Sequence, residues 1–303
     1  ADREEALLDA VRIAVQDMEN AGIELVTDGE MSRVDFNLGF YDYLQGITPL
    51  PVPRMLGVPA HDQRGKYRCV EELSAPEGLG TVQELKRLQQ IATRPIKMPV
   101  PGPFTLSGRI EGGNVYATRE EVTEALIPII NAELKALVAN GCQFIQLDEP
   151  SFAVYPRNPG RFVEIINRTL DGVDGAYISM HMCFGNFRAR AVAHRSYAPL
   201  FPGILDANVD QYALEFASRE MSEIELISQI VERGKSVAMG LVDVKNLWVE
   251  PVELIEERIR TCLKYAPPEA LHVTPDCGFS QTARYAAVNK MKNLAAAAVR
   301  VRG

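Results

Sequence analysis

The side chains most able to do chemistry in this 303-residue chain are one histidine, two cysteines and one glutamate in its second half: His181, Cys183, Glu215 and Cys277. Imidazole, thiolate and carboxylate groups together form a ligand set that zinc prefers in tetrahedral sites. His181 and Cys183 are two residues apart in a run that reads as a strand, so both side chains leave the same face. Cys277 directly follows another apolar run, LHVTPD. Each residue alone would be interpreted as an ordinary buried thiol or core histidine, but their shared placement at strand ends favours a metal site.

Short apolar runs alternate with helical periodicity along the chain, which is typical of an α/β protein with parallel strands. We expect seven strands, of which six start near residues 23, 96, 144, 176, 236 and 271 and one is a poorly defined piece within 203–216. Helices are expected at about 2–21, 119–139, 159–170, 220–233, 251–265 and 282–299. Polar residues end nearly every strand, namely Asp28, Glu30, Asp148, Glu149, Asp243, Lys245 and Asp276 besides the four above. Because (β/α)₈ barrels place their chemistry at the carboxyl ends of all strands, this convergence favours a TIM barrel over a doubly wound open sheet, which gathers its site at one crevice.

We expect one barrel domain over residues 1–303. The strand that should precede the first helix is not in the sequence, so we expect an N-terminal segment with this strand to be missing from the chain. Residues 36–80 are rich in proline, glycine and aromatic side chains and differ from the rest. We expect them to form an insertion, such as a hairpin or lid over one end of the barrel.

The composition excludes some classes of function. The 40 acidic and 32 basic residues give a net charge of −8, which disfavours binding to nucleic acid or to an anionic membrane surface. No apolar run approaches the roughly 18 residues that a membrane span needs. Five scattered cysteines suit a reducing compartment better than a disulfide framework, and no secretory signal is visible. We therefore expect a cytoplasmic enzyme.

Six segments resemble those of one family. TDGEMSRVDF, PGPFTLSG, IQLDEPSF, SMHMCFGNF, LEFASRE and TPDCGF stand in the order found in the catalytic domain of cobalamin-independent methionine synthase, here of a short, single-barrel type. The resemblance implies a zinc-containing (β/α)₈ barrel that transfers a methyl group to the thiol of homocysteine. It also implies that His181, Cys183, Glu215 and Cys277 bind the zinc, and that Glu30 and Asp148 hold the amino group of homocysteine.

The chain departs from the folate-dependent members of that family. We expect it to lack their additional N-terminal barrel. The segment PGPFTLSGRIEGGNVYAT has no tryptophan to stack on the pterin, and the only tryptophan in the sequence is Trp248. The position of their histidine proton donor corresponds to Lys245, a poorer acid near neutrality. Lys245 and Asp243, at the end of the strand from Ser236, are therefore the candidate catalytic residues. These differences favour a methylated corrinoid, free or on a partner protein, as the methyl donor.

Two other functions remain open. A related zinc-thiolate alkyltransferase could use coenzyme M and an epoxide, in which case Arg33, Arg109 or Lys245 would have to bind a sulfonate. A non-catalytic subunit that binds a corrinoid or a corrinoid protein is the second alternative, although a complete set of zinc ligands argues against it.

Overall fold

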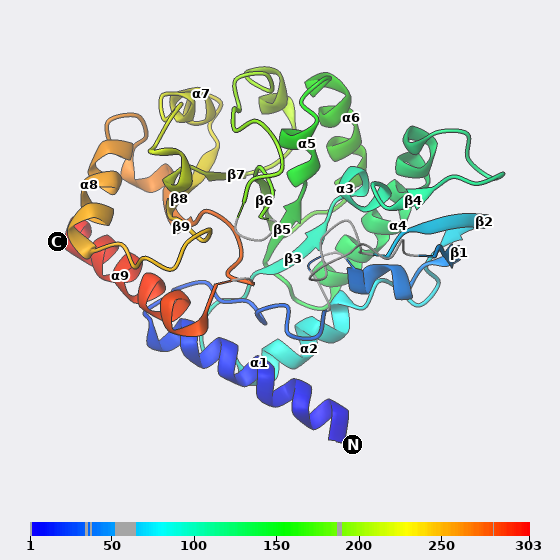
Figure 1. Cartoon of the computed structure of the whole chain (residues 1–303), viewed down its shortest axis with the longest axis horizontal. Coiled ribbons are helices and arrows are strands. Elements are labelled where there is room, and N and C mark those ends of the chain that lie inside the picture. The colour runs from blue at the N-terminus through cyan, green and yellow to red at the C-terminus, as the bar shows by residue number, and fades with distance from the viewer. Residues whose placement is uncertain (1, 34–35, 37, 52–64, 187–189, 281) are drawn as a thin grey trace.

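The centre of the molecule is a parallel sheet of six strands in the order β3-β5-β6-β7-β8-β9 (Figure 1). The computed structural model describes residues 2–33, 36, 38–51, 65–186, 190–280 and 282–303. The strands are β3 (Met98–Pro101), β5 (Phe144–Asp148), β6 (Tyr177–Met182), β7 (Gln211–Glu215), β8 (Ser236–Val242) and β9 (Leu271–Pro275). A single parallel bridge between Val26 and Ile96 extends this sheet beyond β3. The segment from Ile23, expected to be a full strand, therefore contributes only this bridge.

Helices follow the strands and cover the outside of the sheet, which gives the α/β barrel expected from the sequence (Figure 1). They are α1 (Asp2–Asn20), α2 (Thr81–Ile91), α3 (Pro103–Ser107), α4 (Arg119–Ala139), α5 (Pro150–Val154), α6 (Pro159–Thr169), α7 (Leu226–Glu232), α8 (Val252–Cys262) and α9 (Arg284–Arg302). Short 3₁₀ helices span Leu38–Asp42, Gly203–Asp206, Ala217–Arg219 and Pro268–Ala270. In the described ranges no strand pairs with the outer edge of β9, and α1 and α9 contact each other on this side. Within the same ranges, every helix is too short or too polar to cross a membrane.

Local sequence signals explain where several helices begin. Thr118 accepts a hydrogen bond from the backbone N–H of Glu121 and so caps α4, and Asn158 caps α6 in the same way through Arg161. Pro159 then occupies the first turn of α6, where its missing N–H has no cost. The prediction of a long helix over 220–233 is wrong in its first half. Glu220, Met221 and Glu223 have positive φ angles, so a helix forms only from Leu226.

The insertion expected over 36–80 contains a hairpin. Strand β1 (Gln45–Pro49) pairs antiparallel with β2 (Tyr67–Ser74), and β2 pairs in parallel with β4 (Ile110–Glu111), so a separate three-stranded sheet forms beside the barrel (Figure 1). Residues 52–64 lie outside the described residues. The last part of the expected insertion leads into α2, a helix that the sequence analysis did not anticipate.

A buried ion pair fixes the loop after β8. Lys290 of α9 donates to Glu250 at 2.7 Å, and neither side chain is accessible to solvent. The same ammonium group also donates to the carbonyl oxygen of Trp248, while the other oxygen of Glu250 accepts the N–H of Asp243. The pair therefore connects the outer helix to the loop that carries Lys245.

We expect Lys290→Met to lower the free energy of unfolding by about 3–5 kcal/mol, because it leaves the Glu250 carboxylate buried without its cation. Urea unfolding followed by circular dichroism measures this change. Lys292→Met, at an exposed position on the same helix, is the matched control and should change stability by less than about 0.5 kcal/mol. Equal effects of the two substitutions would show that the pair does not hold the loop.

Candidate metal centre and active site

His181, Cys183 and Cys277 converge at the carboxyl ends of the barrel strands. Their ligand atoms all lie within 4.8 Å of one another, and the two sulfur atoms are 3.9 Å apart. His181 lies in β6, Cys183 follows the last residue of this strand, and Cys277 lies two residues after β9. Strand pairing through β7 and β8 brings these distant segments to the same end of the sheet.

The geometry of this group fits zinc. Two thiolates on a tetrahedral zinc ion, each about 2.3 Å from the metal, lie about 3.8 Å apart, close to the 3.9 Å between the two sulfur atoms here. A disulfide, with sulfur atoms about 2.05 Å apart, does not fit. Nδ1 of His181 lies 3.2 Å from the carbonyl oxygen of Ala213, which places the ring proton on Nδ1 and leaves Nε2 available to a metal. The structure thus brings together three of the four ligands expected from the sequence.

Glu215, the fourth expected ligand, lies beside this group without belonging to it. Its fully buried carboxylate is 2.9 Å from the ammonium group of Lys245 and accepts a hydrogen bond from the hydroxyl of Ser218. The other contact of this carboxylate, at 3.5 Å, is with the backbone N–H of Phe184, directly after Cys183. Coordination of zinc by Glu215 therefore stays a prediction, and it requires the carboxylate to turn away from Lys245.

Two residues that the sequence analysis did not assign to the site hold the strand ends together. Asp276 accepts hydrogen bonds from the backbone N–H groups of Phe216, Ala217 and Ser218, and burial raises its pKa to about 7. Tyr197 accepts the N–H of Glu215 and donates to the carbonyl oxygen of Met182. The position of Asp276 next to Cys277 was a usable signal, whereas Tyr197 comes from a loop with no distinctive pattern.

Glu30 and Asp148 are the two expected substrate-binding carboxylates, and the negative charge of Asp148 makes ionisation of Glu30 less favourable. Asp148 ends β5 and pairs in register with His181 of β6. Burial raises the pKa of Asp148, and burial together with the Asp148 charge raises the pKa of Glu30 to about 8 even though Arg33 opposes this shift. Such a pair of carboxylates, with Asp148 buried and Glu30 partly exposed, favours binding of a cation, which would stabilise both negative charges.

Arg33 orients Glu30 and is itself fully engaged. Its guanidinium group lies 2.6 Å from a carboxylate oxygen of Glu30, 2.6 Å from Glu84, and 2.9 Å from the carbonyl oxygen of Pro99. Glu30 has a φ of 55°, a conformation that non-glycine residues rarely adopt. The structure therefore holds Glu30 in a strained backbone conformation, with its carboxylate in an ion pair with Arg33.

The two candidate catalytic residues lie in the turn after β8. Asp243 accepts the backbone N–H of Lys245 at 2.7 Å and the side-chain amide of Asn246. This arrangement is an Asx turn, and it aims Lys245 back at Glu215. Asp243 thus shapes the turn, and a direct part of either residue in catalysis stays a prediction.

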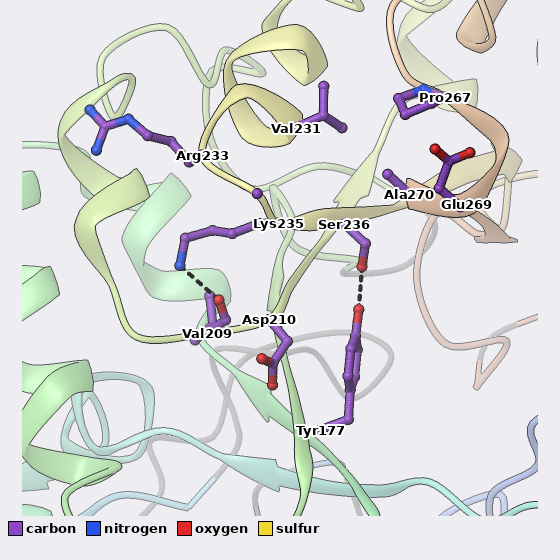
Figure 2. A pocket seen from close by; sticks show the side chains of 11 residues that line it. Tyr177, Val209, Asp210, Val231, Arg233, Lys235, Ser236, Pro267, Glu269 and Ala270 are labelled. Atoms are coloured by element: carbon purple, nitrogen blue, oxygen red, sulfur yellow. Dashed lines mark hydrogen bonds between the residues drawn. The ribbon is translucent and has the colours of Figure 1, made fainter.

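A pocket of about 550 Å³ lies at the opposite, amino-terminal end of the strands (Figure 2). Its polar groups bind one another: Lys235 donates to the carbonyl oxygens of Ala207 and Val209, Tyr177 contacts Ser236, and Asp210 accepts the N–H of Ile178. None of the candidate site residues lines this pocket. In barrels this end contributes to stability rather than to catalysis, so the pocket is not the candidate site.

Comparisons with known proteins agree with the resemblance. Residues 1–300 match the family model described as "Cobalamin-independent synthase, Catalytic domain". The methionine synthase of Pyrococcus abyssi is 32% identical over 294 residues, which cover 97% of this chain and 82% of the relative. That of Pyrococcus furiosus is 32% identical over 302 residues, 99% of this chain and 84% of the relative.

A solved structure gives the same result. The B12-independent methionine synthase from Shewanella sp. W3-18-1, in complex with selenomethionine, superimposes with a TM-score of 0.85 at 28% identity and covers 98% of this chain and 87% of that one. A methyltransferase from Methanosarcina mazei shares the fold, with a TM-score of 0.67 at 14% identity over 97% of this chain and 85% of that one. The chain therefore belongs to the family of cobalamin-independent synthase catalytic domains.

Proposed function

We propose that this protein is a zinc-dependent methyltransferase that forms methionine from homocysteine. The observation that carries the proposal is the convergence of His181, Cys183 and Cys277 within 4.8 Å, at the strand ends that also carry Asp148. The relatives named methionine synthase, which match nearly the whole chain, support the same reaction.

Bound zinc would supply a Lewis acid that converts a substrate thiol, whose pKa is ordinarily near 8.5, into a thiolate at neutral pH. The chain itself must bind and orient the amino acid. Asp148 and Glu30 offer carboxylate oxygens to its ammonium group, where charge-assisted hydrogen bonds are strong. The pairing of Asp148 with His181 in adjacent strands would place this ammonium site next to the metal ligands. Glu215 and Lys245, which pair with each other, would adjust the charge around the thiol.

We further propose that the methyl donor is a methylcobamide. The ammonium group of Lys245, at the position expected for a proton donor to folate, is directed at Glu215 rather than left available to a donor. The only tryptophan, Trp248, is exposed in the loop after β8 and lies outside the segment around α3 where a pterin would stack. When a thiolate takes the methyl group of a methylcobamide, the bond electrons stay on cobalt, and the cob(I)amide leaves without needing a proton. Methyltetrahydrofolate is the alternative donor. The family description, which calls these synthases cobalamin-independent, favours this alternative.

We expect the zinc-loaded protein to form methionine from homocysteine with methylcobalamin, and to form none with methyltetrahydrofolate. Chromatographic measurement of methionine, with the two donors offered in parallel, tests this expectation. Protein stripped of zinc is the control for non-enzymatic transfer. Product with methyltetrahydrofolate would contradict the corrinoid assignment and leave the methyltransferase proposal intact. Product with neither donor would contradict the proposed reaction.

Transfer to coenzyme M is less compatible with the charges of the site. Of the cations that the sequence offered for a sulfonate, Arg33 is paired with Glu30 and Glu84, and Lys245 is paired with Glu215. The carboxylate of Asp148 near the ligand would also disfavour this anion.

A further inference from the structure

A directed chain of hydrogen bonds runs from Lys97 to Asp148 through the side chain of Gln146. The ammonium group of Lys97 donates to the amide oxygen of Gln146 at 2.7 Å, and the amide nitrogen of Gln146 donates to Oδ1 of Asp148 at 2.8 Å. Because lysine can only donate, it fixes which end of the amide faces Asp148. Gln146 and Asp148 are two residues apart in β5, so their side chains share one face of the sheet.

The second carboxylate oxygen of Asp148 has no partner. Within the part of the chain that the structure describes, Oδ2 accepts no hydrogen bond, although the residue is only 6% exposed. Oδ2 is not among the described side-chain atoms that are both fully buried and without a partner, so it stays accessible to a ligand that brings a hydrogen-bond donor. Asp148 pairs in register with His181, so this oxygen belongs to the active site.

Lys97 would be the natural partner for that oxygen, but Gln146 lies between the two charges. A lysine and a carboxylate that share a buried space pair directly unless something separates them, because each is costly to bury alone. Glu30 shows the direct arrangement, since Arg33 contacts its carboxylate at 2.6 Å. The two carboxylates of the site therefore differ. Glu30 contacts the guanidinium group of Arg33 directly, whereas the side-chain amide of Gln146 lies between Asp148 and Lys97.

We propose that Gln146 is a positioning residue for substrate specificity: it orients Asp148 and keeps Lys97 from occupying it, which reserves Oδ2 for the ammonium group of the amino-acid substrate. The inference rests on the proposed role of Asp148 in homocysteine binding. The same arrangement explains how the positive charge of Lys97 can lie near Asp148 while Oδ2 of Asp148 stays available to the ammonium group of a substrate.

The test compares two ligands that differ only in the amino group, methionine and 4-(methylthio)butanoate. Neither has a thiol, so binding to the zinc-loaded protein by isothermal titration calorimetry does not depend on thiol activation. We expect Gln146→Leu to weaken methionine binding about 30-fold, through loss of the oriented hydrogen bond and pairing of Lys97 with Asp148, and to leave 4-(methylthio)butanoate nearly unchanged.

The double variant Gln146→Leu with Lys97→Met separates positioning from a merely structural role. Removal of the competing lysine should recover roughly tenfold of the lost methionine affinity. Gln211→Leu is the control, because Gln211 is also a glutamine in a hydrogen-bonded chain, between Ser179 and Ser236 of neighbouring strands, but is buried at the amino-terminal end of the barrel. It should bind both ligands as the parent protein does.

Two results would overturn the inference. A double variant that binds methionine more weakly than Gln146→Leu would show that the chain of hydrogen bonds only supports the fold. Equal losses for both ligands in Gln146→Leu would show that Gln146 does not act on the amino group. A parent protein that does not distinguish the two ligands would overturn both this inference and the proposed ammonium site.

Discussion

Replacement of Cys183 or Cys277 by serine is expected to abolish stoichiometric zinc binding and to lower the rate of methyl transfer at least about 1,000-fold. Each substitution removes one of three converging ligands, and a serine hydroxyl is a poor substitute for a thiolate. Without the Lewis acid, the substrate thiol stays mostly protonated at neutral pH, and the several kcal/mol that a metal supplies are lost. Zinc content after dialysis, measured by mass spectrometry, and the initial rate of methionine formation give the two readouts.

Cys142→Ser is the matched control for the loss of a buried thiol. Cys142 precedes β5 at the amino-terminal end of the barrel, where its thiol contacts the carbonyl oxygen of Phe144, and a serine hydroxyl can keep this contact. The control should retain zinc and activity. Full zinc content in both Cys183→Ser and Cys277→Ser would rule out the metal centre described here.

The second large effect is expected at the carboxylate pair. Glu30→Gln and Asp148→Asn should each weaken homocysteine binding about 10- to 100-fold, because each removes a charge-assisted hydrogen bond to the ammonium group. Both variants should keep their zinc, since neither residue belongs to the ligand group. Titration calorimetry with homocysteine and with 4-mercaptobutanoate, which lacks the amino group, measures the effect.

The comparison between these two thiols makes the second prediction specific. Binding of 4-mercaptobutanoate should be nearly unchanged in both variants, since this ligand has no ammonium group for either side chain to bind. Glu133→Gln is the control for neutralising a buried carboxylate elsewhere, since Glu133 accepts hydrogen bonds from the backbone of Leu79 and Thr81. Parallel losses for both thiols in Glu30→Gln and Asp148→Asn would contradict the assignment of an ammonium site.

The convergence of the three expected ligands His181, Cys183 and Cys277 could be predicted because it depends on strand ends. A barrel brings the carboxyl ends of its strands together whatever the loops do, so the types and spacing of His181, Cys183 and Cys277 were sufficient. The same logic placed Asp148 correctly, at the end of β5. The helices at 119–139 and 159–170 were predictable because caps and apolar periodicity agree there.

Contacts set by tertiary structure could not be predicted. The pairing of Glu215 with Lys245 depends on the Asx turn at Asp243, and the sequence does not specify the direction in which that turn aims the lysine. Lys97 and Gln146 lie in or next to strands, where a single polar residue looks like an exposed position, so the hydrogen bonds that link them to Asp148 gave no signal in the sequence. The positive φ angles between Glu220 and Glu223 override a helical pattern that the sequence alone favours.

The central claim is that this site binds a metal and presents it to the thiol of an amino acid. Cobalt(II) in place of zinc tests the claim directly, because a thiolate bound to cobalt adds a charge-transfer absorption band in the near ultraviolet, whichever methyl donor the protein uses. We predict that homocysteine increases this band, whereas homoserine, with a hydroxyl in place of the thiol, leaves it unchanged. A cobalt-loaded protein whose spectrum does not respond to homocysteine would contradict the claim.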